Sequence, residues 1–267
     1  MEVLTVMTGE AKGMEQMTLG QMSLFQEQVN MSSPLASRLR PETLDDYVGQ
    51  EHLVGKGKVL RQMIEKDMIS SMIFWGPPGV GKTTLARIIA HMTHASFIDF
   101  SAVTSGIKEI KEVMKRAEDS RMMGMKTIVF VDEIHRFNKA QQDAFLPYVE
   151  KGSIILIGAT TENPSFEINS ALLSRCKVFV LQALTTEHME KLLRHALKDP
   201  RGFGNQTIHM EERILHGIAV FANGDGRMAL NTLDMAVLNG EIGPDGSITV
   251  KEEVLEQCTG KKMLLYD

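Results

Sequence analysis

The stretch Gly76 to Thr84, GPPGVGKTT, constrains the fold of this chain more than any other part of its sequence. It follows a short apolar run, MIFWG, and precedes a segment with helical periodicity, so it lies where a strand turns into a helix. Glycines in such a turn let successive backbone N–H groups face phosphate oxygens, and the helix N-terminus adds partial positive charge. We therefore predict a phosphate-binding loop. The alternative is a tight turn that binds nothing, but this full pattern in this setting is rarely accidental.

The side chains of this loop have distinct expected roles. Lys82 should reach the β- and γ-phosphates of a nucleotide, and Thr83 should ligate Mg²⁺. The loop residues expected to contact the nucleotide are Pro78, Gly79, Val80, Gly81, Lys82, Thr83 and Thr84.

Short apolar runs alternate with amphipathic segments over the first two thirds of the chain. The expected buried strands are 72–76, 96–101, 127–133, 153–161 and 177–181, and the expected helices between them are 82–92, 107–117 and 140–149. Strands that are apolar on both faces and separated by helices indicate an α/β fold whose parallel sheet is covered on both sides. After Leu181 the pattern becomes helical, at 185–199, 210–224, 225–240 and 251–260. We predict a tail at 1–33, an α/β core at 34–182 and a small all-α lid at 183–267.

Composition excludes several classes of protein. The 267 residues are 43% hydrophobic and 24% charged, which is typical of a globular chain with a sizeable core. The net charge of −5 does not indicate a nucleic-acid binder by bulk charge, although a local basic groove is compatible with it. The two cysteines, Cys176 and Cys258, are too few for a disulfide framework and lack metal-ligand spacing. With no membrane-length apolar run and no secretory signal, we expect a cytoplasmic protein.

A second motif, TIVFVDEIHRF, supports the phosphate-binding loop. Its apolar residues place Asp132 and Glu133 at the carboxyl end of a strand, where ligands bind in open α/β sheets. Asp132 suits the shell of a Mg²⁺ ion, and Glu133 suits the polarisation of an attacking water molecule. The alternative is a solvated pair of acids at a helix start.

At these two motifs the sequence resembles the AAA+ ATPases, which implies ATP as ligand, Mg²⁺ as cofactor and ATP hydrolysis as activity. The resemblance also implies further parts. IGATTENP matches the first sensor, with Thr160 and Thr161 as candidates and Thr161 preferred. LLSRC matches the signature of clamp-loader-like members, so Arg175 is the candidate arginine finger that reaches a neighbouring subunit. GDGRMALNTL matches the second sensor, with Arg227 reaching back to the γ-phosphate. Read singly, either arginine is also compatible with a solvated surface position.

The segment RLRPETLDDYVGQEHLV resembles the part that surrounds the adenine in this group. The implied contacts are Leu39, Arg40, Pro41, Val48 and Gly49. The alternative is an ordinary segment that leads into the domain, with Pro41 as a helix stop.

Two absences narrow the family. The interval 101–126 contains no aromatic residue, so it lacks the pore loop of protein unfoldases, and 150–153 is too short for the β-hairpin of RuvB-type branch-migration motors. The strings FSAVTSGIKEI, Val131 to Pro147 and Ile157 to Cys176 instead resemble the RarA/MgsA family, whose eukaryotic relative is the Werner-helicase-interacting protein.

This resemblance implies a DNA-stimulated ATPase that maintains stalled forks, gaps and DNA ends in replication, recombination and repair. Single-strand-binding protein is an implied partner and the bacterial nucleoid an implied location. Lys108, Lys111, Arg136 and Lys139 are candidates for a basic DNA-facing surface, although solvated helix faces explain each of them as well. The family adds a further helical domain that makes it tetrameric. The chain ends at Asp267, where that domain should begin, so we expect a truncated chain for which a monomer is one expected state.

Two other functions remain open from the sequence. One is a dedicated clamp-loader subunit, which a clamp-loading assay would reveal. The other is a nucleotide-gated scaffold with negligible turnover, which would tolerate Glu133→Gln in cells.

The N-terminal tail contains one further pattern. QMSLF resembles the bacterial sliding-clamp-binding pentapeptide, in which the Gln21 amide anchors the peptide, Ser23 matches the third position, and Leu24 and Phe25 fill an apolar pocket. A chance match to a degenerate pattern is the alternative. Loss of clamp binding on changing Leu24 and Phe25 to alanine would distinguish the two.

Overall fold

The computed structural model describes residues 33–101 and 106–260. Its centre is a five-stranded parallel sheet in the order β2-β3-β4-β1-β5. The strands are β1 (Met72–Trp75), β2 (Ser96–Ser101), β3 (Thr127–Asp132), β4 (Ile155–Thr160) and β5 (Lys177–Val180). They lie within the five ranges predicted from the apolar runs.

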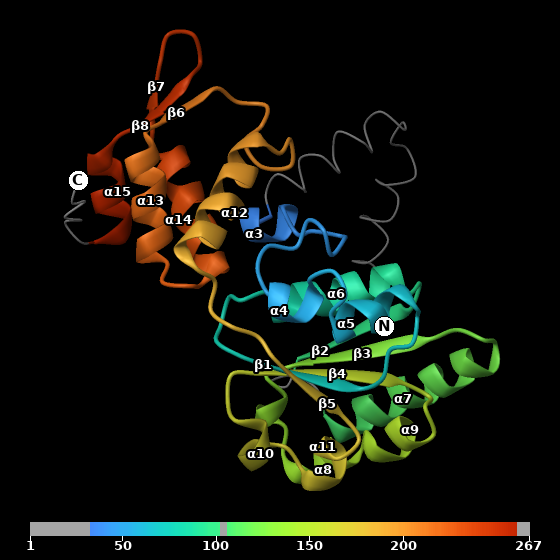
Figure 1. Ribbon diagram of the computed structural model, residues 1–267. Coiled ribbons are helices and arrows are strands. Elements are labelled where there is room, and N and C mark those ends of the chain that lie inside the picture. Colours follow the sequence, from blue (N-terminus) through green and yellow to red (C-terminus); the bar gives the residue numbers. More distant parts are fainter. Residues whose placement is uncertain (1–32, 102–105, 261–267) are drawn as a thin grey trace, which may run out of the picture.

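Both faces of the three central strands β3, β4 and β1 are buried, as their continuous apolar runs require. The expectation that 177–181 is a buried strand is wrong for β5, which lies at the edge of the sheet and leaves Val178 and Val180 exposed. In β1, Met72 and Phe74 pack into one hydrophobic cluster and Ile73 packs into the other, because successive side chains point to opposite faces. Figure 1 shows helices on both sides of the sheet. One side carries α4 (Glu51–Val54), α5 (Val59–Glu65) and α6 (Lys82–Met92). The other carries α7 (Ile107–Met122), the 3-10 helix η1 (Ile134–Arg136), α8 (Lys139–Asp143), α9 (Leu146–Glu150), α10 (Pro164–Glu167) and α11 (Ser170–Leu173).

The single helix predicted over 140–149 is wrong. The structure has two short helices there, α8 and α9, separated at Ala144 and Phe145. Pro147 lies in the first turn of α9, where its missing N–H breaks no helical hydrogen bond. In the middle of one continuous helix the same proline would remove such a bond.

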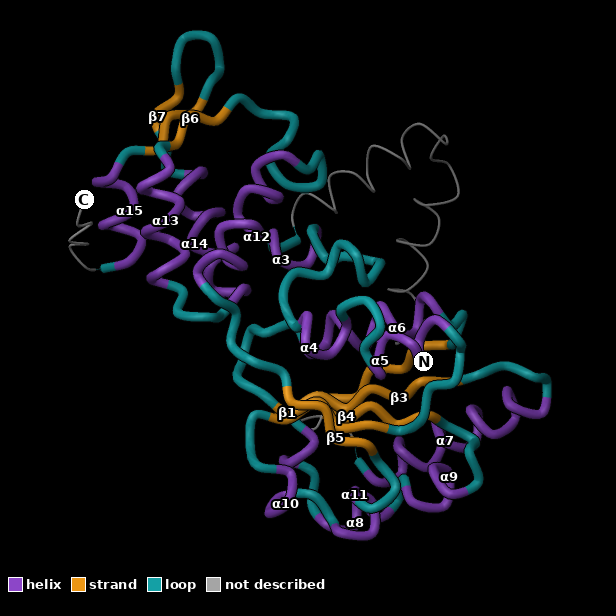
Figure 2. The backbone as a smooth tube through the Cα atoms, in the orientation of Figure 1, coloured by secondary structure: helices purple, strands orange, loops and turns teal. Residues whose placement is uncertain are grey.

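The C-terminal part is a helical lid built on one hydrophobic cluster. Its helices are α12 (Thr186–Lys198), α13 (Glu212–Phe221), α14 (Gly226–Leu238) and α15 (Glu252–Thr259). The lid also contains a small sheet that the sequence analysis missed, formed by β6 (Ile208–Met210), β7 (Glu241–Ile242) and β8 (Ile248–Val250) in the order β6-β8-β7. Figure 2 shows these strands at the end of the lid distant from the main sheet. The expectation of an all-α lid is therefore corrected.

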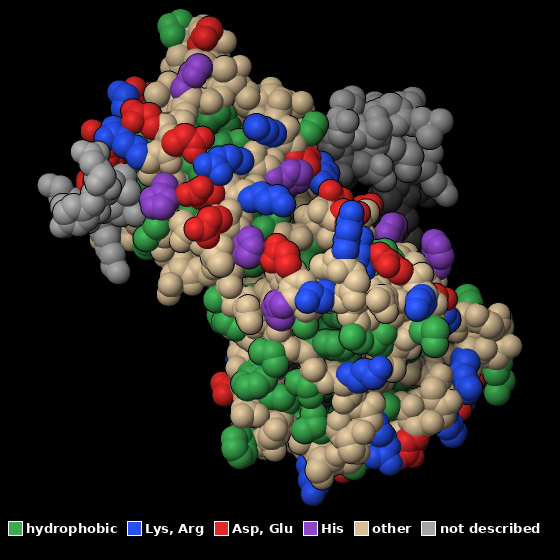
Figure 3. Space-filling view, in the orientation of Figure 1, with side chains coloured by type: hydrophobic (Ala, Val, Ile, Leu, Met, Phe, Trp, Pro, Cys, Tyr) green, Lys and Arg blue, Asp and Glu red, His purple; other side chains and the backbone are tan. Residues whose placement is uncertain are grey.

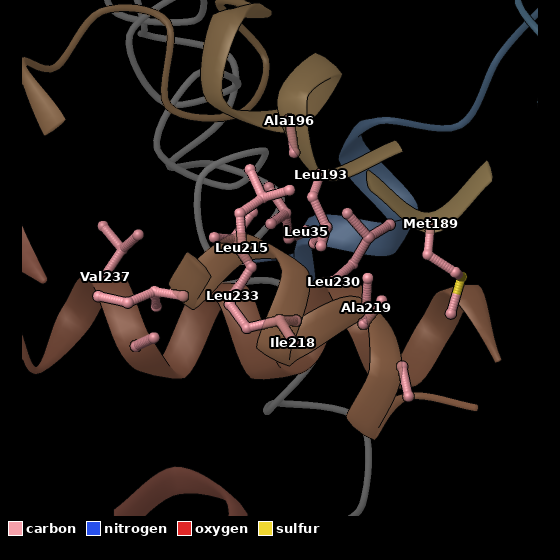
Figure 4. Close-up of a cluster of buried hydrophobic side chains, with 14 of the residues drawn as sticks. Leu35, Met189, Leu193, Ala196, Leu215, Ile218, Ala219, Leu230, Leu233 and Val237 are labelled. Carbon is pink, nitrogen blue, oxygen red and sulfur yellow. The ribbon is translucent and has the colours of Figure 1, made fainter. Parts of the chain in front are cut away.

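The segment before the sheet also belongs to the lid's packing. Helix α3 (Leu35–Arg38) lies against α14, and Leu35 and Leu39 are buried in the lid cluster. Figure 4 shows Leu35 among Leu193, Leu215 and Leu230. Residues 34–39 fall within the predicted core range 34–182, whereas Leu35 and Leu39 pack with the lid.

A side-chain clamp joins the core to the start of the lid. The Gln50 amide donates to the carbonyl of Gln182 at 2.7 Å and accepts from the Gln182 N–H at 2.9 Å. Gly49, with φ of 79°, lies so close to the lid that a Cβ there would approach Leu184 to 2.6 Å. The path from β5 to α12 is thus held against the segment that precedes α4.

Candidate functional site

A pocket of about 440 Å³ lies between the lid and the strand ends. The phosphate-binding loop contributes Pro78 through Thr84 to its wall, β3 contributes Asp132 with Glu133, and the lid contributes Arg227. The segment before α4 contributes Leu39, Arg40, Pro41 and Val48. The structure therefore brings together most of the predicted site residues.

The backbone of the phosphate-binding loop requires glycine at two positions. Gly79 and Gly81 have φ of 68° and 94°, a backbone conformation that residues with a Cβ atom rarely adopt. A buried tyrosine supports the loop from below: the Tyr47 hydroxyl lies 3.2 Å from the carbonyl oxygens of both Val80 and Gly81. A Cβ at Gly81 would stand 2.6 Å from that hydroxyl, so the loop and Tyr47 fit each other closely. Tyr47 was not among the residues predicted from the sequence for this site.

Lys82 begins α6 and is 7% exposed. Its ammonium group donates to the carbonyls of Gly76 and Pro77, each at 2.7 Å. Burial lowers the pKa of Lys82, while the carboxylates of Glu133 and Asp132 act in the opposite direction. Because its direct hydrogen-bond partners are neutral carbonyls, no directly bonded carboxylate neutralises the positive charge of Lys82, which can therefore attract an anion in the pocket.

Asp132 is the last residue of β3 and Glu133 follows it. Both line the same pocket as the first residues of α6. Burial, and next the Glu133 carboxylate, raise the pKa of Asp132. Glu133 has φ of 50°, an uncommon backbone conformation for this residue type. The backbone turns there, so two adjacent acids both reach the pocket.

The end of β4 lies beside the end of β3 and carries the two sensor candidates. The Thr161 hydroxyl donates to Glu133 Oε2 at 3.4 Å. Thr160 is fully buried, and its Oγ1 lies 2.9 Å from His135 Nδ1. That histidine also stands 3.3 Å from Glu133 Oε2. Sequence reasoning missed His135, although it lies two residues after Glu133 inside the quoted motif.

The lid reaches the loop through the first turn of α14. The Gly226 N–H donates to the carbonyl of Gly79 at 3.1 Å, which places Arg227 in the pocket wall. Asp225 caps α14 by accepting from the N–H groups of Arg227 and Met228 at 2.8 and 2.9 Å. Its carboxylate covers Gly79, where a Cβ would be 1.9 Å from Oδ1. Asp225 was also missed, since its contact joins parts of the chain distant in sequence.

Arg40 adds further positive charge to the same wall. Burial lowers the pKa of Arg40, followed in effect by the charges of Arg87 and Arg227. The Nε atom of Arg40 is buried without a hydrogen-bond partner among the described residues. Three cationic side chains, Arg40, Lys82 and Arg227, therefore line the same pocket as the carboxylates of Asp132 and Glu133.

Four predicted residues do not line this pocket: Gly49, Thr160, Thr161 and Arg175. Gly49 packs against the lid, and the two threonines stand behind or beside Glu133. Arg175 follows α11, where it pairs with Glu150 at 2.6 Å and donates to the carbonyl of Ala171. The peptide formed by Gln21 to Phe25 lies outside the described residues.

Comparisons with known proteins agree with this geometry. Residues 72–184 match the model of the ATPase family associated with various cellular activities (AAA), and residues 204–267 match the AAA C-terminal domain. The solved structure of the Thermotoga maritima RuvB Holliday junction branch migration motor superposes with a TM-score of 0.65 at 24% identity, covering 84% of this chain and 72% of that one. At that identity the likeness shows the fold alone.

Two curated relatives are both named replication-associated recombination protein A. That of Escherichia coli K12 is 51% identical over 89% of this chain and 54% of its own length. That of Bacillus subtilis is 41% identical over 88% of this chain and 55% of its own length. The chain thus spans about half the length of these relatives.

Proposed function

Because the chain belongs to the replication-associated recombination protein A family of AAA+ ATPases, we propose that it binds ATP with Mg²⁺ in the lid-covered pocket and hydrolyses it. We further propose that this hydrolysis is stimulated by DNA and serves fork maintenance, recombination and repair at stalled forks, gaps or DNA ends. The observation that carries the proposal is the convergence of the loop lysine, the acid pair of β3 and the lid's Arg227 on one pocket.

The residues of the pocket fit a magnesium nucleotide. The positive φ angles of Gly79 and Gly81 turn the loop as a phosphate cradle requires. The Thr83 hydroxyl and the Asp132 carboxylate supply the oxygen ligands that Mg²⁺ prefers. When bound, this ion would neutralise charge on the β- and γ-phosphates. Leu39, Arg40, Pro41 and Val48 would surround the base.

The chain's own residues account for the rest of the chemistry. Lys82 places a positive charge at the phosphates, and the Glu133 carboxylate orients a water molecule and accepts its proton. Thr161, in contact with Glu133, is the proposed first sensor. Arg227 stabilises the γ-phosphate from the lid. Arg175, outside this pocket, is proposed to act on the nucleotide of a neighbouring subunit.

The proposed partners follow from the family. Lys108, Lys111, Arg136 and Lys139 are all exposed, which supports DNA contact through them. On the face in Figure 3, basic and acidic side chains are interspersed, so we propose that other subunits complete the DNA surface. Single-strand-binding protein, the sliding clamp at Gln21 to Phe25, and homo-oligomerisation of the full-length protein are also proposed. No helix in 33–101 or 106–260 has the length and apolarity to cross a membrane, and we propose a cytoplasmic, nucleoid-associated location.

The test is ATP hydrolysis measured with gapped, forked and blunt DNA of equal length. We expect DNA to raise the rate, Lys82→Ala to abolish nucleotide binding, and Glu133→Gln to retain binding while losing roughly 10²–10⁴ in rate. Lys56→Ala, an exposed lysine outside the pocket, serves as the control.

Several outcomes would contradict parts of the proposal. Equal rates with and without every DNA would end the DNA-stimulated part. Unchanged turnover in Glu133→Gln would end the assigned role of that carboxylate. Hydrolysis that is fast and independent of protein concentration would end the role of Arg175 in trans.

A further inference from the structure

His135 joins the two strand ends that carry the water-activating group. It lies in η1, directly after β3, and its side chain is 15% exposed. One ring atom, Nδ1, stands 2.9 Å from Thr160 Oγ1 and 3.3 Å from Glu133 Oε2. A single nitrogen therefore faces both the end of β4 and the carboxylate beyond β3.

The surrounding hydrogen bonds fix which form of the ring fits. Thr160 Oγ1 accepts from the Glu162 N–H at 3.0 Å, and its own proton is directed to the Glu162 carbonyl at 3.3 Å. An ionised carboxylate only accepts hydrogen bonds. Both neighbours of Nδ1 can accept a hydrogen bond and the carboxylate can only accept, so a proton on Nδ1 is the form that satisfies both contacts.

The Glu133 carboxylate needs external support. Its backbone is held at φ of 50° and does not by itself fix the side chain. The other close polar contact of its carboxylate among the described residues is the 3.4 Å hydrogen bond from Thr161. Without His135, this carboxylate would keep one long hydrogen bond and would be free to adopt other rotamers.

We propose that His135 is a positioning residue, which holds the Glu133 carboxylate against the end of β4 through its Nδ1–H. The proposal rests on the function proposed above, in which Glu133 activates the water. His135 is not among the residues that line the pocket, so its effect is on the orientation of Glu133 and not on nucleotide binding. It also ties that orientation to the buried Thr160, next to the sensor candidate Thr161.

The kinetic test compares His135→Ala, His135→Asn and the exposed control His209→Ala. His135→Ala should lower kcat about tenfold, one decade of the roughly 10²–10⁴ that a positioned general base supplies. KM and the affinity for a fluorescent ATP analogue should stay within about twofold. His135→Asn places an amide nitrogen where Nδ1 stood and should recover most of the loss. In a Glu133→Gln background, His135→Ala should cost nothing further.

Three results would overturn the proposal: kcat unchanged or raised in His135→Ala, kcat and nucleotide affinity lost together, or His135→Asn no better than His135→Ala. If the wild-type chain and Lys82→Ala both show no hydrolysis, the proposed function fails instead. The ring tautomer then decides the proposal independently, by long-range ¹⁵N–¹H spectra of the wild-type chain. A proton on Nδ1 supports the contact, and a bare Nδ1 overturns it.

Discussion

Adding a methyl group at Gly79 tests whether the lid rests on the phosphate-binding loop in the nucleotide-free protein. A Cβ at this position would stand 1.9 Å from Asp225 Oδ1, 2.1 Å from its Cγ and 2.7 Å from its Oδ2. All three atoms belong to one carboxylate, which also caps α14. Gly79→Ala can therefore be accommodated only if that carboxylate leaves its cap or the lid moves away.

The expected cost has two parts. Alanine at φ of 68° costs roughly 1–2 kcal/mol relative to glycine, because its Cβ crowds the carbonyl. Displacement of the Asp225 cap costs a further 0.5–2 kcal/mol, approximately the cost of Asp225→Ala itself. Gly79→Ala should thus lower the free energy of unfolding by roughly 1.5–4 kcal/mol in the wild type, but only by about 1–2 kcal/mol in Asp225→Ala.

The assay is a double-mutant cycle measured by urea unfolding without nucleotide. The coupling between the two changes should be about 0.5–2 kcal/mol, with the double variant more stable than the sum of single costs predicts. Gly57→Ala is the matched control, because Gly57 has φ of 79° and nothing within 4 Å of an added Cβ. Its cost should be the same with and without Asp225. If Gly79→Ala and Asp225→Ala are also additive, the lid does not rest on the loop in solution.

Two further predictions concern groups buried around the pocket. Tyr47→Phe removes the hydroxyl that lies 3.2 Å from two loop carbonyls, so the free energy of unfolding should fall by about 1 kcal/mol. The control is Tyr148→Phe, because the Tyr148 hydroxyl forms no hydrogen bond to a described residue, and this change should alter the free energy of unfolding little. If both substitutions have equal effects in urea unfolding, Tyr47 does not support the phosphate-binding loop. Burial and the Glu133 carboxylate raise the pKa of Asp132 in the folded protein above its ordinary 3.8. Between pH 3.8 and that raised pKa, the folded protein binds more protons than the unfolded chain. The folded state therefore loses stability as the pH rises through this range. In Mg²⁺-free buffer, Asp132→Asn should therefore be more stable than the wild type at pH 7, with the gain shrinking toward about pH 4; lower stability at pH 7 would refute this.

Local patterns predicted the fold well where burial alone determines the structure. Each strand of the main sheet lies in a short, mostly apolar run of consecutive residues, so local sequence was enough to locate it. The small lid sheet escaped prediction because β7 covers only Glu241–Ile242 and β8 only Ile248–Val250. Runs of two or three residues are too short to establish a period. Pro147 was a sequence signal for the break between α8 and α9. The prediction of one helix over 140–149 instead followed the helical periodicity of the apolar residues.

The site was predictable to the extent that its residues belong to contiguous motifs. Lys82, Asp132 and Glu133 were identified because each belongs to a contiguous motif at the carboxyl end of a strand, and parallel strands end at the same edge of a sheet. Tyr47, His135 and Asp225 were not, because their roles depend on partners 33, 25 and about 146 residues away. Whether Thr160 or Thr161 is the sensor remains a prediction, although the contact with Glu133 belongs to Thr161.

The strand order explains why these contacts meet at one place. Because β4 lies between β3 and β1, the end that carries Thr161 has the end that carries Glu133 on one side and the start of the phosphate-binding loop on the other. The lid closes the same edge through the hydrogen bond from Gly226 to Gly79. The Asp225 carboxylate lies over Gly79 of this loop, so it would repel an anion bound at the proposed phosphate site. If the loop binds phosphate as proposed, phosphate occupancy and the position of α14 should be linked, and the link should act in both directions. Arg227 follows Asp225 by two residues, so a shift of this turn should move both the cap and the side chain proposed to contact the γ-phosphate.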